Sequence, residues 1–468
     1  MRDAVFTTRQ LGMRFLWIDS LCIIQDSLSD VEQELSKMRD IYKNAYVTIS
    51  AASARDCNQG FLDLRPETNF GPEPEIPPFI LPFLCPDGTL ASITLKLLQS
   101  QVKINEPIND RAWTLQESLL SPRILIYSKT QLFWKCKTAF CRDGGHLTWN
   151  SYSNMSGISK LRFGDIGKSD AGGQVGPPGS QFRFPVPPHS TLARQEWQEV
   201  IQDYSRRQLS VPEDKLPALS AMAAEYQSAL QTEYLAGLWR SYLIFDLMWI
   251  RPSRQQATRP ATFRCPSWSW ASLDGQIGFK DMGLREFAPE AEIIRCVTSP
   301  TSALVPFGRV NGGELVIQGP LKKVDLVIDT AQNPEIVGDA LGDPVTAYFD
   351  ATIGKLEVYP NPRDGETLSD ESEILEEPSS ANKLSSLGEC RSSPPLGNGV
   401  PGWCLTLGLS IEKDESLATN PRIRRAHGLL LTKADSDRFQ RVGWFHTPHK
   451  VDRADWFISG PRETIVII

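Results

Sequence analysis

The chain has 468 residues, of which 41% are hydrophobic and 22% are charged, so it is an ordinary globular sequence with room for two or three domains. Its 49 basic and 56 acidic side chains give a net charge of −7, which disfavours general binding to nucleic acids. No apolar run is long enough for a membrane span, and nine cysteines without regular spacing favour reduced thiols and a cytoplasmic location.

A helix and a buried strand are predicted at the start of the chain. Residues 3–11 have helical character and stop at Gly12, a common C-terminal cap. Residues 15–24 form a short apolar run, rich in aromatic and β-branched side chains, which predicts a buried strand. Asp19 lies within that run, where a carboxylate is costly unless it is partnered or functional. It could cap the next turn, pair with a buried arginine or belong to a functional site.

A second helix and a second strand follow. Ser29 and Glu32 have the spacing of a capping box, and apolar residues then recur at helical spacing up to Ala45. The β-branched residues 47–51 predict a strand. The order helix, strand, helix, strand predicts an α/β domain over residues 1–150, with a parallel sheet.

The remainder of this domain is predicted to contain a loop, a helix and a hairpin. Residues 69–86 are rich in proline and are predicted to form a loop. A helix is predicted from residue 109 or 110 to Leu120, before the Ser-Pro pair that stops it. Residues 123–127 and 131–136 then have the pattern of a β-hairpin.

The best candidate site combines this helix with Asp19. Trp113 and Glu117 are four residues apart and share a helix face, while Arg111 is expected in the first turn. Ligand pockets of parallel sheets form outside the carboxyl ends of the strands, so we expect Asp19 and this helix to border one pocket. An arginine at a helix start favours an anionic ligand such as a phosphate. The alternative is structural, with an ion pair between Arg111 and Glu117, or between an arginine and Asp19, that holds the helix on the sheet.

A helical segment is predicted in the middle of the chain. Residues 151–189 are rich in glycine, serine and proline and predict a flexible linker, and residues 190–272 are predicted to be mainly helical. Trp268 and Trp270 alternate as on a strand with one buried face, and we expect them to pack in a core. Helices are predicted over three stretches, around residues 197–204, 216–226 and 234–249.

A β-rich region is predicted from residue 273 to the C-terminus. Short strands dominate it and favour a mostly antiparallel arrangement. Residues 361–401 are acidic and poor in aromatic side chains, which predicts a disordered insert. The predicted strands are at residues 314–318, 324–328, 404–407, 428–431, 442–445 and 464–468.

Several long motifs resemble the fungal heterokaryon incompatibility (HET) domain. They lie at residues 16–26, 38–45 and 109–117, and the segments at 204–220, 234–239 and 266–272 are similar to those that follow the domain in many members. The resemblance implies an effector of non-self recognition that triggers programmed cell death, through protein partners or self-association. Members usually open with a Ser-Tyr-x-Trp-Gly element on the first strand, which does not precede Met1. The resemblance therefore implies a domain without its first strand, from a shortened gene model or in a truncated, inactive relative.

The order of elements also resembles, more remotely, that of Toll-like signalling (TIR) domains, some of which cleave NAD with a helical glutamate. This resemblance implies a flavodoxin- or TIR-like parallel sheet, with Glu117 as the catalytic carboxylate. Asp19, Arg111 and Trp113 would then bind the ligand, and NAD would be a substrate rather than a resident cofactor. The alternative is a non-enzymatic signalling adaptor, in which the same domain serves as an assembly interface.

Overall fold

The computed structural model describes most of the helical and strand elements of the chain. The predicted linker at 151–189 and the acidic insert at 361–401 lie outside the described residues, apart from residues 188–189 and 400–401. The described residues are 1–62, 79–95, 106–129, 132–136, 139–142, 145–147, 188–252, 257–279, 287–328, 334–337, 341, 345–350, 400–413, 422–447 and 454–468.

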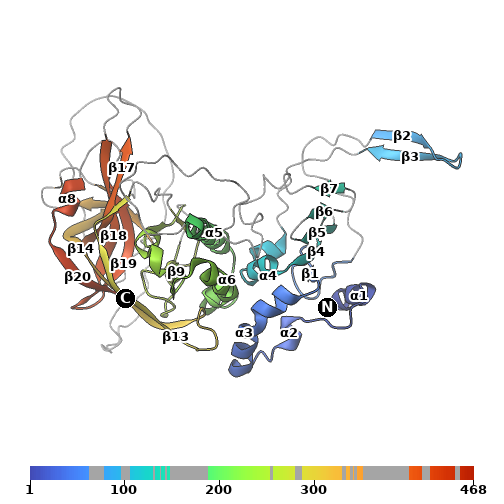
Figure 1. The fold of residues 1–468 in the computed structure, drawn as a ribbon, viewed down its shortest axis with the longest axis horizontal. Helices are drawn as coiled ribbons and strands as arrows, with labels where there is room; N and C mark the ends of the chain where they lie inside the picture. The colour runs from blue at the N-terminus through green and yellow to red at the C-terminus, as the bar shows by residue number, and fades with distance from the viewer. Residues whose placement is uncertain are drawn as a thin grey trace, which may run out of the picture. The chain divides into compact units, whose positions relative to one another are not determined.

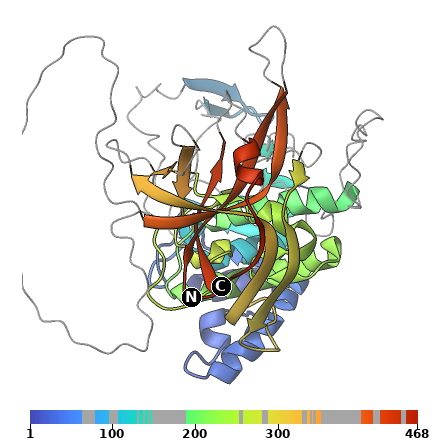
Figure 2. The ribbon, with the colours of Figure 1, turned by 90° about the vertical axis from the view of Figure 1, so that its left-hand side faces the viewer.

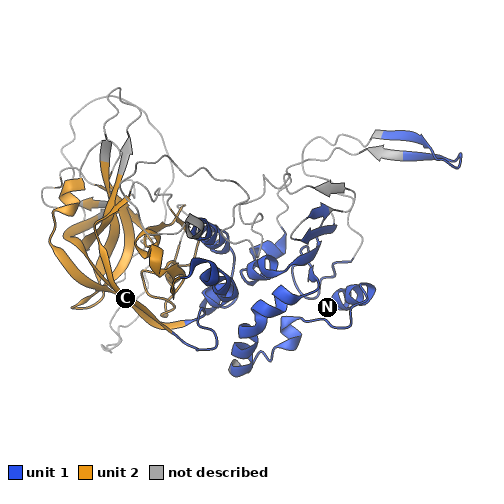
Figure 3. Cartoon of the chain, in the orientation of Figure 1, with its two compact units in different colours: residues 1–176, 184–231, 300–309 blue, residues 177–183, 232–299, 310–468 orange. Residues whose placement is uncertain are grey.

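The chain divides into two compact units that interleave along the sequence (Figure 3). Unit 1 comprises residues 1–176, 184–231 and 300–309, and unit 2 comprises residues 177–183, 232–299 and 310–468. The predicted domains, with boundaries at about residues 150, 189 and 272, are instead consecutive along the chain. Whether they fold as independent domains stays a prediction.

Unit 1 begins with three helices, α1 (Arg2–Gln10), α2 (Asp19–Cys22) and α3 (Leu28–Asn44) (Figure 1). The predicted end of α1 is confirmed, because Gly12 adopts a φ of 70° and its N–H bonds back to the Arg9 carbonyl at 3.0 Å. The predicted capping box is wrong by two residues. Ser27 caps α3 by accepting the Asp30 N–H at 3.4 Å, and Glu32 accepts a hydrogen bond from Ser302 instead.

The predicted buried strand over residues 15–24 is wrong. Its centre is the short helix α2, and Phe15 is 84% exposed whereas Ile23 is buried. The Asp19 carboxylate accepts the Ser20 N–H at 2.7 Å, in the first turn of α2, where the helix dipole favours a negative charge. Because α2 turns the chain, residues 15–24 contain no strand.

The sheet of unit 1 is mixed, with the strand order β1-β4-β5-β6-β7. β1 and β4 are parallel, and each later pair is antiparallel, so the expected parallel sheet is wrong beyond its first pair and a TIR-like fold is not confirmed. Hairpin connections leave no room for the crossover that a parallel neighbour needs. The predicted hairpin is confirmed as β4 and β5. The strands are β1 (Thr48–Ser50), β4 (Arg123–Tyr127), β5 (Leu132–Cys136), β6 (Phe140–Arg142) and β7 (Gly145–Leu147).

Part of the predicted loop at 69–86 is also a strand. β2 (Phe79–Leu84) pairs antiparallel with β3 (Leu90–Leu95), although Pro82 lies in its middle. Proline is tolerated there because the two strands form a separate pair, in which each has an open edge.

Unit 1 contains further helices, two of which precede β4 while the others follow β7. The helix predicted around 197–204 is confirmed within α5, which buries Trp197, Val200, Ile201 and Tyr204. The second predicted helix is confirmed in part, since two short 3-10 turns precede α6. The elements are η1 (Pro107–Asp110), α4 (Trp113–Leu120), α5 (Pro188–Tyr204), η4 (Pro212–Lys215), η5 (Pro217–Leu219) and α6 (Ser220–Leu230).

A third helix was predicted over residues 234–249, in unit 2, and that prediction is wrong for most of the stretch, since only residues 240–246 are helical. Ala236 and Gly237 have φ angles of 45° and 99°, which makes a tight two-residue hairpin turn between β8 and β9. Apolar spacing alone could not reveal these left-handed residues. The elements over this stretch are β8 (Tyr234–Leu235), β9 (Leu238–Trp239), η6 (Arg240–Tyr242), α7 (Leu243–Asp246) and β10 (Trp249–Ile250).

The core role expected of Trp268 and Trp270 is confirmed, since both are fully buried. Their segment is not a strand, however, because it turns into η7 (Trp270–Ser272). The Trp270 indole N–H donates to the Gly237 carbonyl at 3.1 Å, so the ring packs directly on the hairpin turn.

The predicted antiparallel β region is confirmed in the remainder of unit 2. Its large sheet is antiparallel throughout the described pairs except where β19 runs parallel to β20, and Figure 2 shows its long strands strongly twisted. The elements are β11 (Gly278–Phe279), β12 (Phe287–Pro289), β13 (Glu292–Pro300), β14 (Val310–Ile328), β15 (Pro334–Val337), β16 (Val345–Phe349), β17 (Val400–Lys413), β18 (Arg422–Lys433), β19 (Arg438–His446), α8 (Ala454–Ile458) and β20 (Arg462–Ile467).

Replacing Gly237 by alanine should destabilise unit 2 by about 2–4 kcal/mol, the cost of a left-handed non-glycine residue plus overpacking. A Cβ at this position would lie 2.5 Å from the Trp270 indole nitrogen. Chemical denaturation measures the change. Gly312→Ala in β14 is the control, because its Cβ would meet nothing within 4 Å, and equal effects of the two substitutions would contradict the prediction.

Candidate functional site

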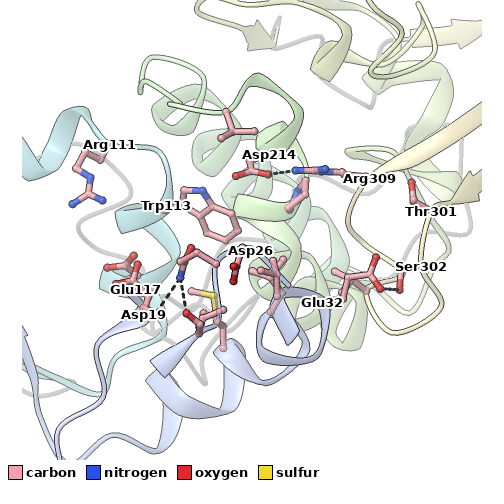
Figure 4. Close-up of a pocket in the computed structure, with 18 residues that line it drawn as sticks. Asp19, Asp26, Glu32, Arg111, Trp113, Glu117, Asp214, Thr301, Ser302 and Arg309 are labelled. Carbon is pink, nitrogen blue, oxygen red and sulfur yellow. Dashed lines mark hydrogen bonds and ion pairs between the residues drawn. The ribbon is translucent and has the colours of Figure 1, made fainter. Parts of the chain in front are cut away.

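Unit 1 contains a cavity of about 560 Å³, a volume typical of small-molecule sites (Figure 4). Its walls come from α2, α3, α4, the chain around η4, and the segment 300–309. The four side chains singled out from the sequence, Asp19, Arg111, Trp113 and Glu117, all line it. The structure thus brings the sequence-predicted residues to one place, although Asp19 reaches it from a helix rather than a strand.

The start of α4 is fixed by a backbone contact with the chain that follows α5. Arg111 is extended between η1 and α4, so its predicted position in the first helical turn is wrong. The Ala112 N–H donates to the Gln208 carbonyl at 2.9 Å, and the Gln208 N–H donates to the Asp110 carbonyl at 2.6 Å. This strand-like bridge replaces the side-chain cap expected from residue 109 or 110 and sets where Trp113 and Glu117 point.

Glu117 has the electrostatics of an acid–base group. Burial and the nearby Asp19 carboxylate raise its pKa to about 7, against the opposing effects of Arg111, a hydrogen bond from Tyr42, and Arg207. Its side chain is nonetheless partly accessible from the cavity. A carboxyl group with this pKa exchanges its proton near neutral pH, so it can act as a general base or a general acid.

Tyr42 is the main site residue that sequence reasoning missed. Its position in the apolar stripe of α3 indicated packing, but its hydroxyl is hydrogen-bonded to the Glu117 carboxyl. Burial and the charges of Glu117 and Asp19 hold its pKa far above the ordinary value, so the phenol keeps its proton and donates. Trp17 meets the Tyr42 ring edge-on, with centroids 5.7 Å apart, and holds the ring in place.

The structural alternative for Arg111 is not observed. Within the described residues, no ion pair of 4.0 Å or less joins Arg111 to Glu117 or to Asp19. Arg207, from the chain after α5, holds the backbone at Arg111. Its guanidinium pairs with Asp203 at 2.8 Å and donates to the Arg111 carbonyl at 3.3 Å.

The cavity lining is mostly acidic, so among its described residues it favours an anionic ligand group at Arg111 alone. Only two guanidinium groups face the cavity against five carboxylic side chains, and Arg309 is already paired with Asp214. A neutral or cationic group is therefore favoured beside Glu117. The carboxylic residues are Asp19, Asp26, Glu32, Glu117 and Asp214.

Residues 1–117 match the family model of the heterokaryon incompatibility protein (HET). The chain carries a HET domain. The match runs from α1 to Glu117 and so includes all four predicted site residues, and the HET domain links the chain to heterokaryon incompatibility in fungi. No curated protein and no solved structure matches the chain. In the described part of the chain, the helices are too short or too polar to cross a membrane.

Replacing Glu117 by glutamine should make stability less sensitive to pH. The folded protein raises the pKa of this carboxyl from 4.5 to about 7, so the wild type loses stability as pH rises through that window, by up to about 3 kcal/mol. The Glu117→Gln variant should gain stability relative to wild type between pH 5 and pH 8. Guanidinium denaturation at both pH values measures the gain.

Glu225→Gln in α6 provides a control of opposite sign. Hydrogen bonds from Lys43 and Arg39 outweigh the effect of burial and lower the Glu225 pKa, so its contribution is present at neutral pH and fades as pH falls. This variant should lose more stability at pH 8 than at pH 4. A Glu117 variant with the same pH dependence as Glu225→Gln would contradict the assignment of a raised pKa to Glu117.

Proposed function

We propose that this HET-domain protein is a cytoplasmic effector of fungal non-self recognition that triggers programmed cell death by hydrolysing NAD in the cavity around Glu117. The observation that carries the proposal is a partly buried carboxyl with a pKa near 7, beside a second carboxylate and a tyrosine donor. The fold gives no further support, because the sheet is mixed. The proposal therefore rests on the chemistry of the site.

The site residues supply what cleavage of an N-glycosidic bond requires. The bond between the ribose and nicotinamide breaks with its electron pair leaving on nicotinamide, and positive charge builds on the ribose. The ionised Glu117, with Asp19 nearby, stabilises that charge. Water then adds to the sugar and its proton passes to Glu117, which gives ADP-ribose, nicotinamide and one proton.

The other lining residues have positioning roles in this reaction. Trp113 offers an aromatic face to the cationic nicotinamide ring, which suits the acidic lining. Arg111 would bind the phosphates of NAD, because Arg309, the other arginine in the lining, is paired with Asp214. Tyr42 orients the Glu117 carboxyl and lowers its pKa, so that a larger fraction is ionised at neutral pH.

A second candidate function is a non-enzymatic adaptor that acts through self-association or protein partners. It is favoured by the large apolar side chains exposed around α1 and α2, because contiguous exposed apolar surface commonly marks a protein interface. These are Val5, Phe6, Leu11, Phe15, Leu21 and Ile24.

Nicotinamide release from NAD by the purified chain tests the two functions. We expect Glu117→Gln to lower kcat/KM by about 100-fold or more, and Glu225→Gln to leave it unchanged. If wild type and Glu117→Gln both show background release while both kill cells on expression, the enzyme is excluded. Killing that is lost together with oligomers, for example in Phe15→Asp, would favour the adaptor.

Replacing Tyr42 by phenylalanine should shift the acid limb of the kcat/KM profile to higher pH by about one unit, since a hydrogen bond that favours the ionised Glu117 is lost. Tyr46→Phe is the matched control, because Tyr46 is 65% exposed and packs against Arg123. An unchanged limb in Tyr42→Phe would show that the hydroxyl does not act on Glu117.

A further inference from the structure

The cavity is completed by a segment far outside the HET match. Residues 300–309 connect β13 to β14, the long strands of unit 2, yet they pack within unit 1. Thr301, Ser302, Val305 and Arg309 line the cavity. Figure 4 shows Thr301, Ser302 and Arg309 on the side away from Asp19 and Glu117. We call residues 300–309 the strap.

Two polar contacts fasten the strap across the cavity. The Arg309 guanidinium pairs with the Asp214 carboxylate of η4 at 2.6 Å. The Ser302 hydroxyl donates to the Glu32 carboxylate of α3 at 3.1 Å. Asp214 and Glu32 line the cavity themselves, so both fastenings lie at its margin.

The strap is also a preformed unit. The Thr301 N–H donates to the Arg309 carbonyl at 2.8 Å and closes its base. Inside it, the Gly308 N–H donates to the Val305 carbonyl at 2.9 Å. Because these bonds are internal, they do not depend on the contacts of the strap with α3 and η4.

We infer that the strap is a closing element of the cavity, which restricts access to Glu117 while its two fastenings hold and admits a ligand when they break. The inference extends the proposed function to regulation of the same site, and it needs only that ligands reach Glu117 through this cavity. Each fastening is partly exposed, and contacts of this kind change an equilibrium by about two- to fivefold. The open and closed states are therefore close enough in free energy to be shifted.

The ends of the strap suggest how it would be controlled. It continues directly into β13 and β14, so a displacement of either strand along its own axis would reach Thr301 or Arg309 first. The C-terminal β region would then act on the cavity through its own chain, with a single covalent connection at each end of the strap.

Chemical labelling of Glu117 tests this inference without NAD. A water-soluble carbodiimide with glycine methyl ester modifies protonated carboxyl groups, and mass spectrometry gives the rate at Glu117 in the full-length protein at pH 6.5. We expect the double variant Ser302→Ala/Arg309→Ala to be labelled at least about threefold faster than wild type. The exchanged pair Asp214→Arg/Arg309→Asp should return towards the wild-type rate.

The matched control is Arg295→Ala on β13. Arg295 pairs with Glu314 at 2.6 Å and does not line the cavity, so its loss should leave the labelling rate unchanged. Equal rates in wild type and the strap variant, or equal acceleration by Arg295→Ala, would overturn the inference. Because labelling needs no turnover, a chain that closes its strap but releases no nicotinamide would refute the proposed function alone.

Discussion

The placement of one partly buried carboxyl group, Glu117, is the constraint on which unit 1 depends. Burial and the nearby Asp19 destabilise the ionised form of Glu117, so near neutral pH this group lowers the stability of the folded chain. Tyr42 and Arg111 only partly offset this cost. Ionisable groups that lower the stability of the fold and lie in a cavity are characteristic of functional sites, so we assign the central role to this carboxyl group.

The contacts that hold unit 1 together extend beyond the HET match. The beginning of α4 depends on the backbone bridge to Gln208, and α3 is tied to α6 because Arg39 and Lys43 both bond Glu225. These contacts join residues 96 to 186 positions apart in sequence. The compact unit is therefore larger than the region that sequence similarity identifies, and the cavity belongs to the larger unit.

In unit 2, a buried arginine joins the irregular chain near β10 to the large sheet. Arg441 of β19 is fully buried, bonds the Asp350 carboxylate at 2.9 Å and lies 3.4 Å from the Trp249 ring centroid. It also donates to the Trp249 carbonyl at 2.8 Å. A buried ion pair of this kind adds little net stability, but it fixes one arrangement because each partner would be costly alone.

The sequence by itself determined the elements whose evidence is local. Helical periodicity located α3 and α5, alternating β-branched residues located β1 and the antiparallel strands, and long motifs indicated the HET domain. It also predicted that Asp19, Arg111, Trp113 and Glu117 border one pocket, and all four line the cavity, although Asp19 lies on a helix and not at the predicted strand.

Only the tertiary structure decided the features that depend on distant chain. An apolar run such as residues 15–24 does not show whether a neighbouring strand is available to pair with it. Here the run contains the helix α2 and leaves Phe15 exposed. Periodicity likewise could not show the left-handed Ala236 and Gly237, which turn a predicted helix into a hairpin. The role of Tyr42 and the strap at 300–309 arise from contacts between segments that are remote in sequence, and no local pattern records such contacts.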